Sequence, residues 1–173
     1  IDLNNRKVDL IAERFDIAIR ASSQLDDSSL ISRTIYSADA VVVAAPSYLQ
    51  QFGTPTTVIE LANHCAITYS HLKQPDVWSF INPRGETETI KVSSRIQTNS
   101  SELEISLCVA GHGVMLMPRF NLNGEIERGE LVELLTEYQR PEVNVYVVYP
   151  SRKHMSAKVR SFIDFTCAEL ATN

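Results

Sequence analysis

Residues 99–118 read NSSELEISLCVAGHGVMLMP and open with a strong signal for the start of a helix. Ser101 and Glu104 have the spacing of a capping box, in which the side chain of each residue satisfies the backbone N–H of the other. Asn99 and Glu102 have the same spacing and offer an alternative cap. We therefore predict that a helix begins in this turn.

The same stretch also contains the end of that helix and a buried strand. The helix is predicted to run to Ala110 and to end at Gly111, because glycine readily adopts the left-handed conformation that closes a helix. Residues 114–117 follow as an uninterrupted apolar run, which Pro118 ends. A helix that leads directly into a buried strand is typical of α/β folds.

Outward from this stretch, strand and helix patterns alternate along the whole chain. This alternation predicts an α/β protein with a mostly parallel sheet and helices on both faces. Helical patterns cover 8–15, 47–52, 59–61 and 99–110, with a polar helix near Ile126 and a final helix capped by Ser156. Strand patterns cover 1–4, 16–20, 30–36, 40–45, 65–69, 78–81, 89–98, 114–117, 131–135 and 143–149.

Composition limits the kinds of partner that the chain can have. Its 173 residues, 44% of them hydrophobic, suffice for one domain or two small lobes. With 16 Lys and Arg against 21 Asp and Glu, the net charge is −5, which disfavours binding to nucleic-acid phosphates. No apolar run approaches the roughly 20 residues that cross a membrane, and no signal-peptide pattern is present. The 3 cysteines show no paired spacing, so we expect a reducing cytoplasm.

Motifs that carry catalysis or bind a cofactor are missing from the sequence. There is no nucleophile elbow, no phosphate-binding loop and no metal-binding spacing, which predicts a protein that is not an enzyme and holds no cofactor. His64 lies beside Cys65, but no second pair of such ligands stands at a matching distance along the chain. We therefore predict no metal site.

Four segments, taken together in their order, resemble the effector-binding domain of LysR-type transcriptional regulators. The resemblance extends over nearly the whole chain, and the first and last segments are its most specific parts. The four segments are VDLIAERFDIAIR (8–20), APSYL (45–49), AGHGVMLMP (110–118), and YPSRKH (149–154) running into VRSFIDF (159–165).

This resemblance implies two α/β lobes like those of type II periplasmic binding proteins, joined by two crossing strands, with the effector between the lobes. Lobe one would comprise 1–45 and 148–173 and lobe two 46–147, with crossings near Ala45 and Val147. The family's winged helix-turn-helix, linker helix and first strand and helix of lobe one would lie upstream of Ile1, so the chain resembles a fragment. DNA would be bound only through that absent part.

The effector cleft of the family receives the amino ends of helices and the loops that follow strands, where ligands also bind in open α/β sheets. Thr98, Asn99, Ser100 and Ser101 would offer hydroxyls and free backbone N–H groups at a positive helix end, which suits a carboxylate. Simple helix capping is an equally good interpretation of these residues, and the two roles can coexist.

Other candidates for the effector site come from strand ends elsewhere in the chain. Arg20, Ala21 and Ser22 are predicted to follow a strand and to face the same cleft. There Arg20 could bind a carboxylate with its guanidinium, or it could pair with a surface acid. Tyr69 and Ser70 could close the far wall of the cleft, but an ordinary strand end is the simpler interpretation of them. For Asn4, turn chemistry alone is the simpler interpretation. The full set outside the helix start is Arg20, Ala21, Ser22, Tyr69, Ser70 and Asn4.

The function favoured by the sequence is therefore a small-molecule sensor that also forms homo-oligomers, within a LysR-type DNA-binding regulator. A small organic anion or polar metabolite is the expected effector, because a helix amino end and a guanidinium both favour negative charge. Two alternatives remain open on the sequence alone. A periplasmic solute receptor of a transporter, or an enzyme on a similar scaffold, would share the two-lobed fold.

Overall fold

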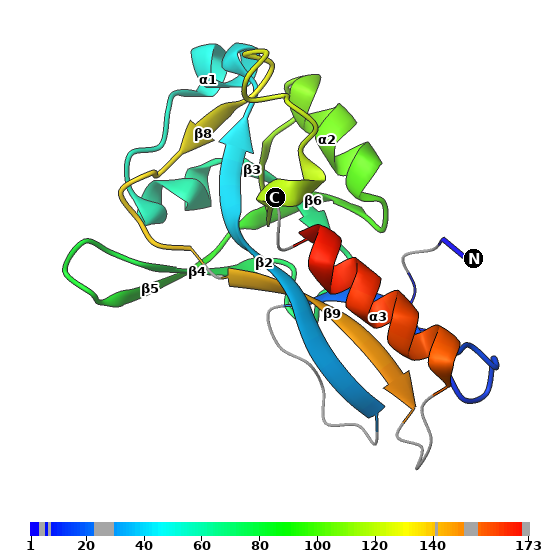
Figure 1. The fold of residues 1–173 in the computed structure, drawn as a ribbon. Helices are drawn as coiled ribbons and strands as arrows, with labels where there is room; N and C mark the ends of the chain where they lie inside the picture. Colours follow the sequence, from blue (N-terminus) through cyan, green and yellow to red (C-terminus); the bar gives the residue numbers. More distant parts are fainter. Residues whose placement is uncertain (4–5, 7, 23–29, 141, 151–155, 171–173) are drawn as a thin grey trace. The chain divides into compact units, whose positions relative to one another are not determined.

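A computed structural model describes residues 1–3, 6, 8–22, 30–140, 142–150 and 156–170 of the chain (Figure 1). The chain divides into two compact units, which we describe separately. Unit 1 comprises Ile1–Asn5 and Asp39–Pro141, and unit 2 comprises Arg6–Ala38 and Glu142–Asn173. The limits given above for the two lobes, and their crossings, stay predictions.

Unit 1 is built on a mixed sheet in the strand order β2-β7-β3-β6, with β8 paired to β2. The β3–β7 and β3–β6 pairs are parallel, whereas β2 runs antiparallel to both β7 and β8. The prediction of a mostly parallel sheet was therefore wrong, because only β6, β3 and β7 run in the same direction. The strands are β2 (Leu30–Ala44), β3 (Cys65–Tyr69), β6 (Ser93–Thr98), β7 (Val114–Pro118) and β8 (Val132–Leu134).

The core of unit 1 forms around the last residues of β2. Val41, Val42 and Val43 are fully buried, because both faces of the sheet are covered at this point. Ile67 of β3 and Met115 of β7 are also fully buried in the same cluster. Burial of side chains of this size contributes roughly 1.5–3 kcal/mol each relative to exposure.

Helices and a separate hairpin complete unit 1. Proline stands in the first turn of α1, and Gly53 with φ of 86° ends it, as the sequence predicts. Thr57 and Glu60 form a capping box at the start of a short 3-10 helix, η1. The elements are α1 (Pro46–Phe52), η1 (Val58–Asn63), α2 (Ser101–Val109), η2 (Arg119–Asn121) and the antiparallel hairpin of β4 (Val77–Ile81) and β5 (Thr87–Lys91).

Unit 2 joins distant parts of the sequence. β1 (Ala18–Ser22) pairs antiparallel with β9 (Glu142–Pro150), which also lies next to β2. The final helix, α3 (Ala157–Leu170), packs along these strands (Figure 1) through Val159 and Ile163, which bury against Val147. The backbone N–H of Val159 donates to Ser156 Oγ at 3.4 Å, which confirms the predicted cap.

The first part of the chain departs most from its sequence pattern. The helix predicted for 8–15 is absent, and turns take its place. Asp9 Oδ1 accepts the backbone N–H groups of Ile11 and Ala12 at 2.9 and 3.0 Å, and Arg14 has a φ of 59°, so the chain closes on itself instead of continuing as a helix. Residues 1–3 are exposed and form no strand.

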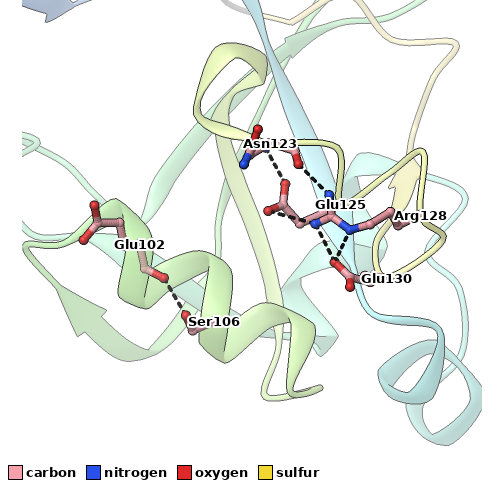
Figure 2. Close-up of polar contacts among 6 residues, drawn as sticks. All are labelled: Glu102, Ser106, Asn123, Glu125, Arg128 and Glu130. Atoms are coloured by element: carbon pink, nitrogen blue, oxygen red, sulfur yellow. Dashed lines mark hydrogen bonds and ion pairs between the residues drawn. The ribbon is translucent and has the colours of Figure 1, made fainter.

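A second predicted helix, near Ile126, is also replaced by turns. Gly124 has a φ of 87°, and a network centred on Arg128 fixes the loop (Figure 2). The Arg128 guanidinium donates to the carbonyl of Asn123 at 2.6 Å and to Glu130 at 2.8 Å, and lies 3.4 Å from Glu125. These local contacts hold the loop without a helix.

Strand limits also differ from those predicted. Residues 30–36 and 40–45, predicted as two strands, form the single strand β2, and 89–98 is divided between β5 and β6. β1 begins at Ala18 rather than at Asp16. By contrast, β3 has the limits that the sequence pattern predicts.

Candidate functional site

The carboxyl ends of β3 and β6 lie side by side in unit 1, and α2 begins shortly after β6. Tyr69 and Thr98, the last residues of the two strands, are register partners. The backbone N–H of Ser70 donates to the carbonyl of Thr98 at 2.9 Å. The structure thus brings Tyr69 and Ser70 next to the start of the helix, as expected for neighbouring parallel strands.

Ser100 is the residue that caps α2. Its Oγ accepts the backbone N–H of Leu103 at 3.3 Å, and its own N–H donates to Thr98 Oγ1 at 3.1 Å. Neither predicted capping box forms, whether from Ser101 or from Asn99. The helix begins one residue after Ser100, and Glu104 is buried, so its side chain does not return to the helix start.

Two backbone N–H groups remain available at this helix end. In the part of the chain that the structure describes, the N–H groups of Ser101 and Glu102 have no hydrogen-bond acceptor. Orphan donors of this kind, together with the positive end of the helix dipole, attract anions. The Thr98 and Ser100 hydroxyls lie within the same turn, and we define residues 69–70 and 98–102 as the α2 site.

Glu104 is a member of this region that the sequence analysis missed. It is only 3% exposed, and among the described residues its carboxyl group has no hydrogen-bond partner. Burial raises the pKa of Glu104 to about 7. The pKa of Tyr69 is raised first by burial and then by the charge of Glu104, so the two groups lie close enough to interact. Glu104 lies four residues before Cys108, and residues four apart share one face of a helix. This spacing from an apolar residue could have indicated that Glu104 is buried.

The second group of candidates lies in unit 2, on β1. Arg20, Ala21 and Ser22 belong to the strand instead of following it, because β1 extends to Ser22. Arg20 is half-buried, and its Nη2 donates to the backbone carbonyl of Val8 at 2.6 Å. Its hydrogen bond is thus to a carbonyl and not to the surface acid considered above. Asn4 lies outside the described residues.

His64 and Cys65, considered above as metal ligands, have a structural environment. His64 is buried, its Nδ1 lies 3.2 Å from the Tyr48 hydroxyl, and burial lowers its pKa. Across the described ranges, no group of three or more His, Cys, Asp or Glu residues is arranged to hold a metal ion. No helix within those ranges is long and apolar enough to span a membrane.

Comparison with known proteins assigns the class. The family model of the LysR substrate binding domain matches residues 1–171, so this chain belongs to the LysR substrate-binding domain family. It is therefore the regulatory, effector-binding domain of a LysR-type transcriptional regulator. Domains of this family bind small-molecule effectors and oligomerise.

Individual relatives agree with this class. The chain is 35% identical over 161 residues to an uncharacterized HTH-type transcriptional regulator of Haemophilus influenzae, covering 92% of this chain and 54% of the relative. It is 32% identical over 167 residues to the HTH-type transcriptional regulator CrgA of Neisseria meningitidis serogroup B, covering 96% and 55%. The chain thus spans about half the length of the curated relatives it matches.

Solved structures show the same fold. The full-length virulence activator AphB of Vibrio cholerae matches with a TM-score of 0.80 and 31% identity, over 97% of this chain and 56% of that one. The regulatory domain of Neisseria meningitidis CrgA matches with a TM-score of 0.79 and 32% identity, over 92% and 78%. These relatives are named as transcriptional regulators and not as enzymes, in agreement with the prediction. The family assignment therefore favours the regulator over the alternative of a periplasmic solute receptor.

Proposed function

We propose that this domain senses a small organic anion or polar metabolite, and that the α2 site holds its negatively charged group. The observation that carries the proposal is the pair of unpartnered N–H groups of Ser101 and Glu102, beside the hydroxyls of Thr98 and Ser100. Two N–H donors that point along a helix axis bind a carboxylate without any basic side chain. Charge-assisted hydrogen bonds contribute roughly 1.5–3 kcal/mol each.

Arg20 is proposed as a second contact to the effector, together with Ala21 and Ser22. The Arg20 guanidinium has five N–H donors, and the Val8 carbonyl occupies one side of it. Donors remain for a carboxylate, and the family's effector cleft receives residues from both lobes. Asn4 keeps a lesser place in this proposal, on the sequence alone.

The protein that contains this domain is proposed to be a cytoplasmic, homo-oligomeric regulator that binds DNA through another segment. Support comes from the relatives, which are named as HTH-type regulators and are about twice as long as the matched region. The acidic charge of −5 makes this domain unsuited to bind DNA itself. Effector binding would act by shifting the equilibrium between two arrangements of the protein.

The charge of the effector can be tested with a pair of variants at Ser100. Ser100→Asn and Ser100→Asp both keep a good helix cap and nearly the same side-chain shape, but only the second adds a negative charge. Thermal-shift screening of acidic metabolites and their neutral amides should first find a ligand. Its affinity, measured by calorimetry, should then fall about tenfold or more in Ser100→Asp relative to Ser100→Asn.

Ser106 supplies the matched control, because its hydroxyl donates to the Glu102 carbonyl at 2.8 Å farther along the same helix (Figure 2). Ser106→Asp adds the same charge outside the α2 site and should change affinity much less. Arg20→Ala should weaken binding of the same ligand. Equal affinities in Ser100→Asn and Ser100→Asp would show that the α2 site does not hold an anionic group.

A further inference from the structure

A small pocket opens in unit 2, where α3 packs on the sheet. Its volume is about 220 Å³, room for roughly seven water molecules at about 30 Å³ each. It arises because three residues of α3 at positions i, i+3 and i+4 share the face that meets β2 and β9. The lining residues are Arg33 of β2, Tyr149 of β9, and Arg160, Ile163 and Asp164 of α3.

Hydrogen-bond donors dominate the polar lining of this pocket. Within the described ranges, neither the Arg160 guanidinium nor the Tyr149 hydroxyl has a hydrogen-bond or ion-pair partner. Arg33 Nη1 lies 3.7 Å from Asp164 Oδ1, and these side chains are 53% and 65% exposed. An ion pair this long and this exposed contributes little to stability. Three donor groups therefore line one pocket, and Asp164 is the only carboxylate among its described lining residues.

The pocket also has an apolar side. Ile163 is 3% exposed and belongs to the hydrophobic cluster of unit 2, and Tyr149 packs against the same cluster. Two guanidinium groups and a phenolic hydroxyl suit the oxygens of a carboxylate. The half-buried ring of Tyr149 lies beside these donors, so the pocket favours an anion that has an apolar body over one that is polar throughout.

We propose that this pocket is a second ligand site, which binds a small organic carboxylate. The carboxylate accepts hydrogen bonds from Arg160 and Tyr149, and its apolar body lies against the half-buried ring of Tyr149. Arg33 also donates to the carboxylate once it leaves its ion pair with Asp164, so Asp164 competes with the ligand for Arg33. The site lies in unit 2 and uses none of the residues of the α2 site, so it does not depend on the function proposed above.

The test is a titration of the 173-residue chain with butyrate and, separately, with inorganic phosphate at constant ionic strength, followed by two-dimensional ¹H–¹⁵N NMR. Butyrate should give saturable shifts at the backbone amides of Arg33, Tyr149 and residues 160–164. Arg160→Ala should weaken butyrate binding about tenfold, equivalent to about 1.4 kcal/mol. Asp164→Asn should strengthen it, because Arg33 is then released.

Controls separate this site from general attraction of anions. Arg84→Ala removes the same charge from the turn of the hairpin in unit 1 and should leave the shifts unchanged. Ser100→Asp alters the α2 site and should likewise leave them unchanged. The proposal is overturned if butyrate gives no saturable shifts, if Arg84→Ala weakens binding as much as Arg160→Ala, or if phosphate binds as tightly as butyrate.

Discussion

The hydroxyl oxygen of Tyr48 accepts the backbone N–H of Cys65 at 2.9 Å. The same oxygen lies 3.2 Å from His64 Nδ1. Because the amide can only donate, the hydroxyl proton is left for His64 Nδ1, and neutral His64 then carries its own proton on Nε2. The lowered pKa of His64, caused by burial, favours that neutral form. One hydroxyl thus links α1 to the first residue of β3.

Tyr48→Phe should destabilise the protein by about 1–2 kcal/mol, because the partly buried N–H of Cys65 loses its acceptor. Urea unfolding measures this change. Tyr138→Phe is the matched control: its ring packs on Phe80 at 6.3 Å, and in the described part of the chain its hydroxyl has no partner. If the two variants lose the same stability, the Tyr48 hydrogen bonds contribute nothing.

Glu104→Gln should stabilise the protein in a pH-dependent way. The pKa of Glu104 is about 7 in the folded state against 4.5 for the unperturbed group, so ionisation at higher pH costs folding free energy. The gain from Glu104→Gln should be small near pH 4.5, grow as the pH rises, and reach up to about 3 kcal/mol above pH 7. Urea unfolding across this range, with the exposed Glu137→Gln as a control, measures it. A gain that does not change with pH would contradict the assignment.

The same carboxyl group should make anion binding at the α2 site depend on pH. Ionised Glu104 repels an anion at the start of its own helix, whereas the protonated form does not. Affinity for an anionic effector should therefore rise by about threefold or more between pH 8 and pH 6. Calorimetry at both pH values should show this dependence in the parent chain and its loss in Glu104→Gln. The prediction fails if the dependence is the same in both proteins.

Gly113→Ala should destabilise the protein by about 2 kcal/mol or more. A Cβ atom at residue 113 would overlap the Cys65 carbonyl oxygen, and backbone cannot move aside as a flexible side chain can. Gly129→Ala is the comparison, because Gly129 has a φ of 73° but open space around it, and should cost only about 1–2 kcal/mol. Thermal unfolding of both variants ranks them, and the reverse order would contradict the packing argument.

Glu133→Ala should cost about 3 kcal/mol. Glu133 is bonded to Arg140 and to Arg119, each at 2.6 Å, and the Arg140 side chain is only 10% exposed. Burial by itself raises the pKa of Glu133, but the bonds to the two arginines outweigh it and lower the pKa. Removing Glu133 leaves the Arg140 charge buried without its partner. Glu130→Ala, which breaks only the exposed pair with Arg128 (Figure 2), should cost less than about 1 kcal/mol in the same unfolding assay.

The limits of helices and strands were predictable where the local sequence pattern and the packing agree. β3 has its predicted limits, and the helix from residue 101 ends just before Gly111, as expected. The two glycines of 111–113 serve different needs. Gly111 has a φ of 80°, which a turn pattern can reveal, but the close approach of Gly113 to Cys65 depends on a residue far away in the sequence.

The errors have physical causes of three kinds. In 8–15 the apolar spacing suits a helix, but Asp9 takes the N–H groups that a helix would use, so side-chain chemistry overrides periodicity. Strand direction is set by pairing between distant segments, as in the antiparallel pair of β2 and β7, and no local pattern contains it. Glu104 was overlooked because a charged residue in a first turn is usually solvated.

β2 belongs to both units: residues 30–38 are part of unit 2 and residues 39–44 part of unit 1. Adjacent residues of a strand face opposite sides of a sheet, so deleting one residue within 30–44 reverses the faces of all that follow or precede it. Such a deletion could not be confined to the nearer unit, because Val42 must stay paired with Leu116 while Ser37 stays bonded to Asn144. Among natural variants of this chain, length changes should therefore accumulate in the turns and be excluded from this strand.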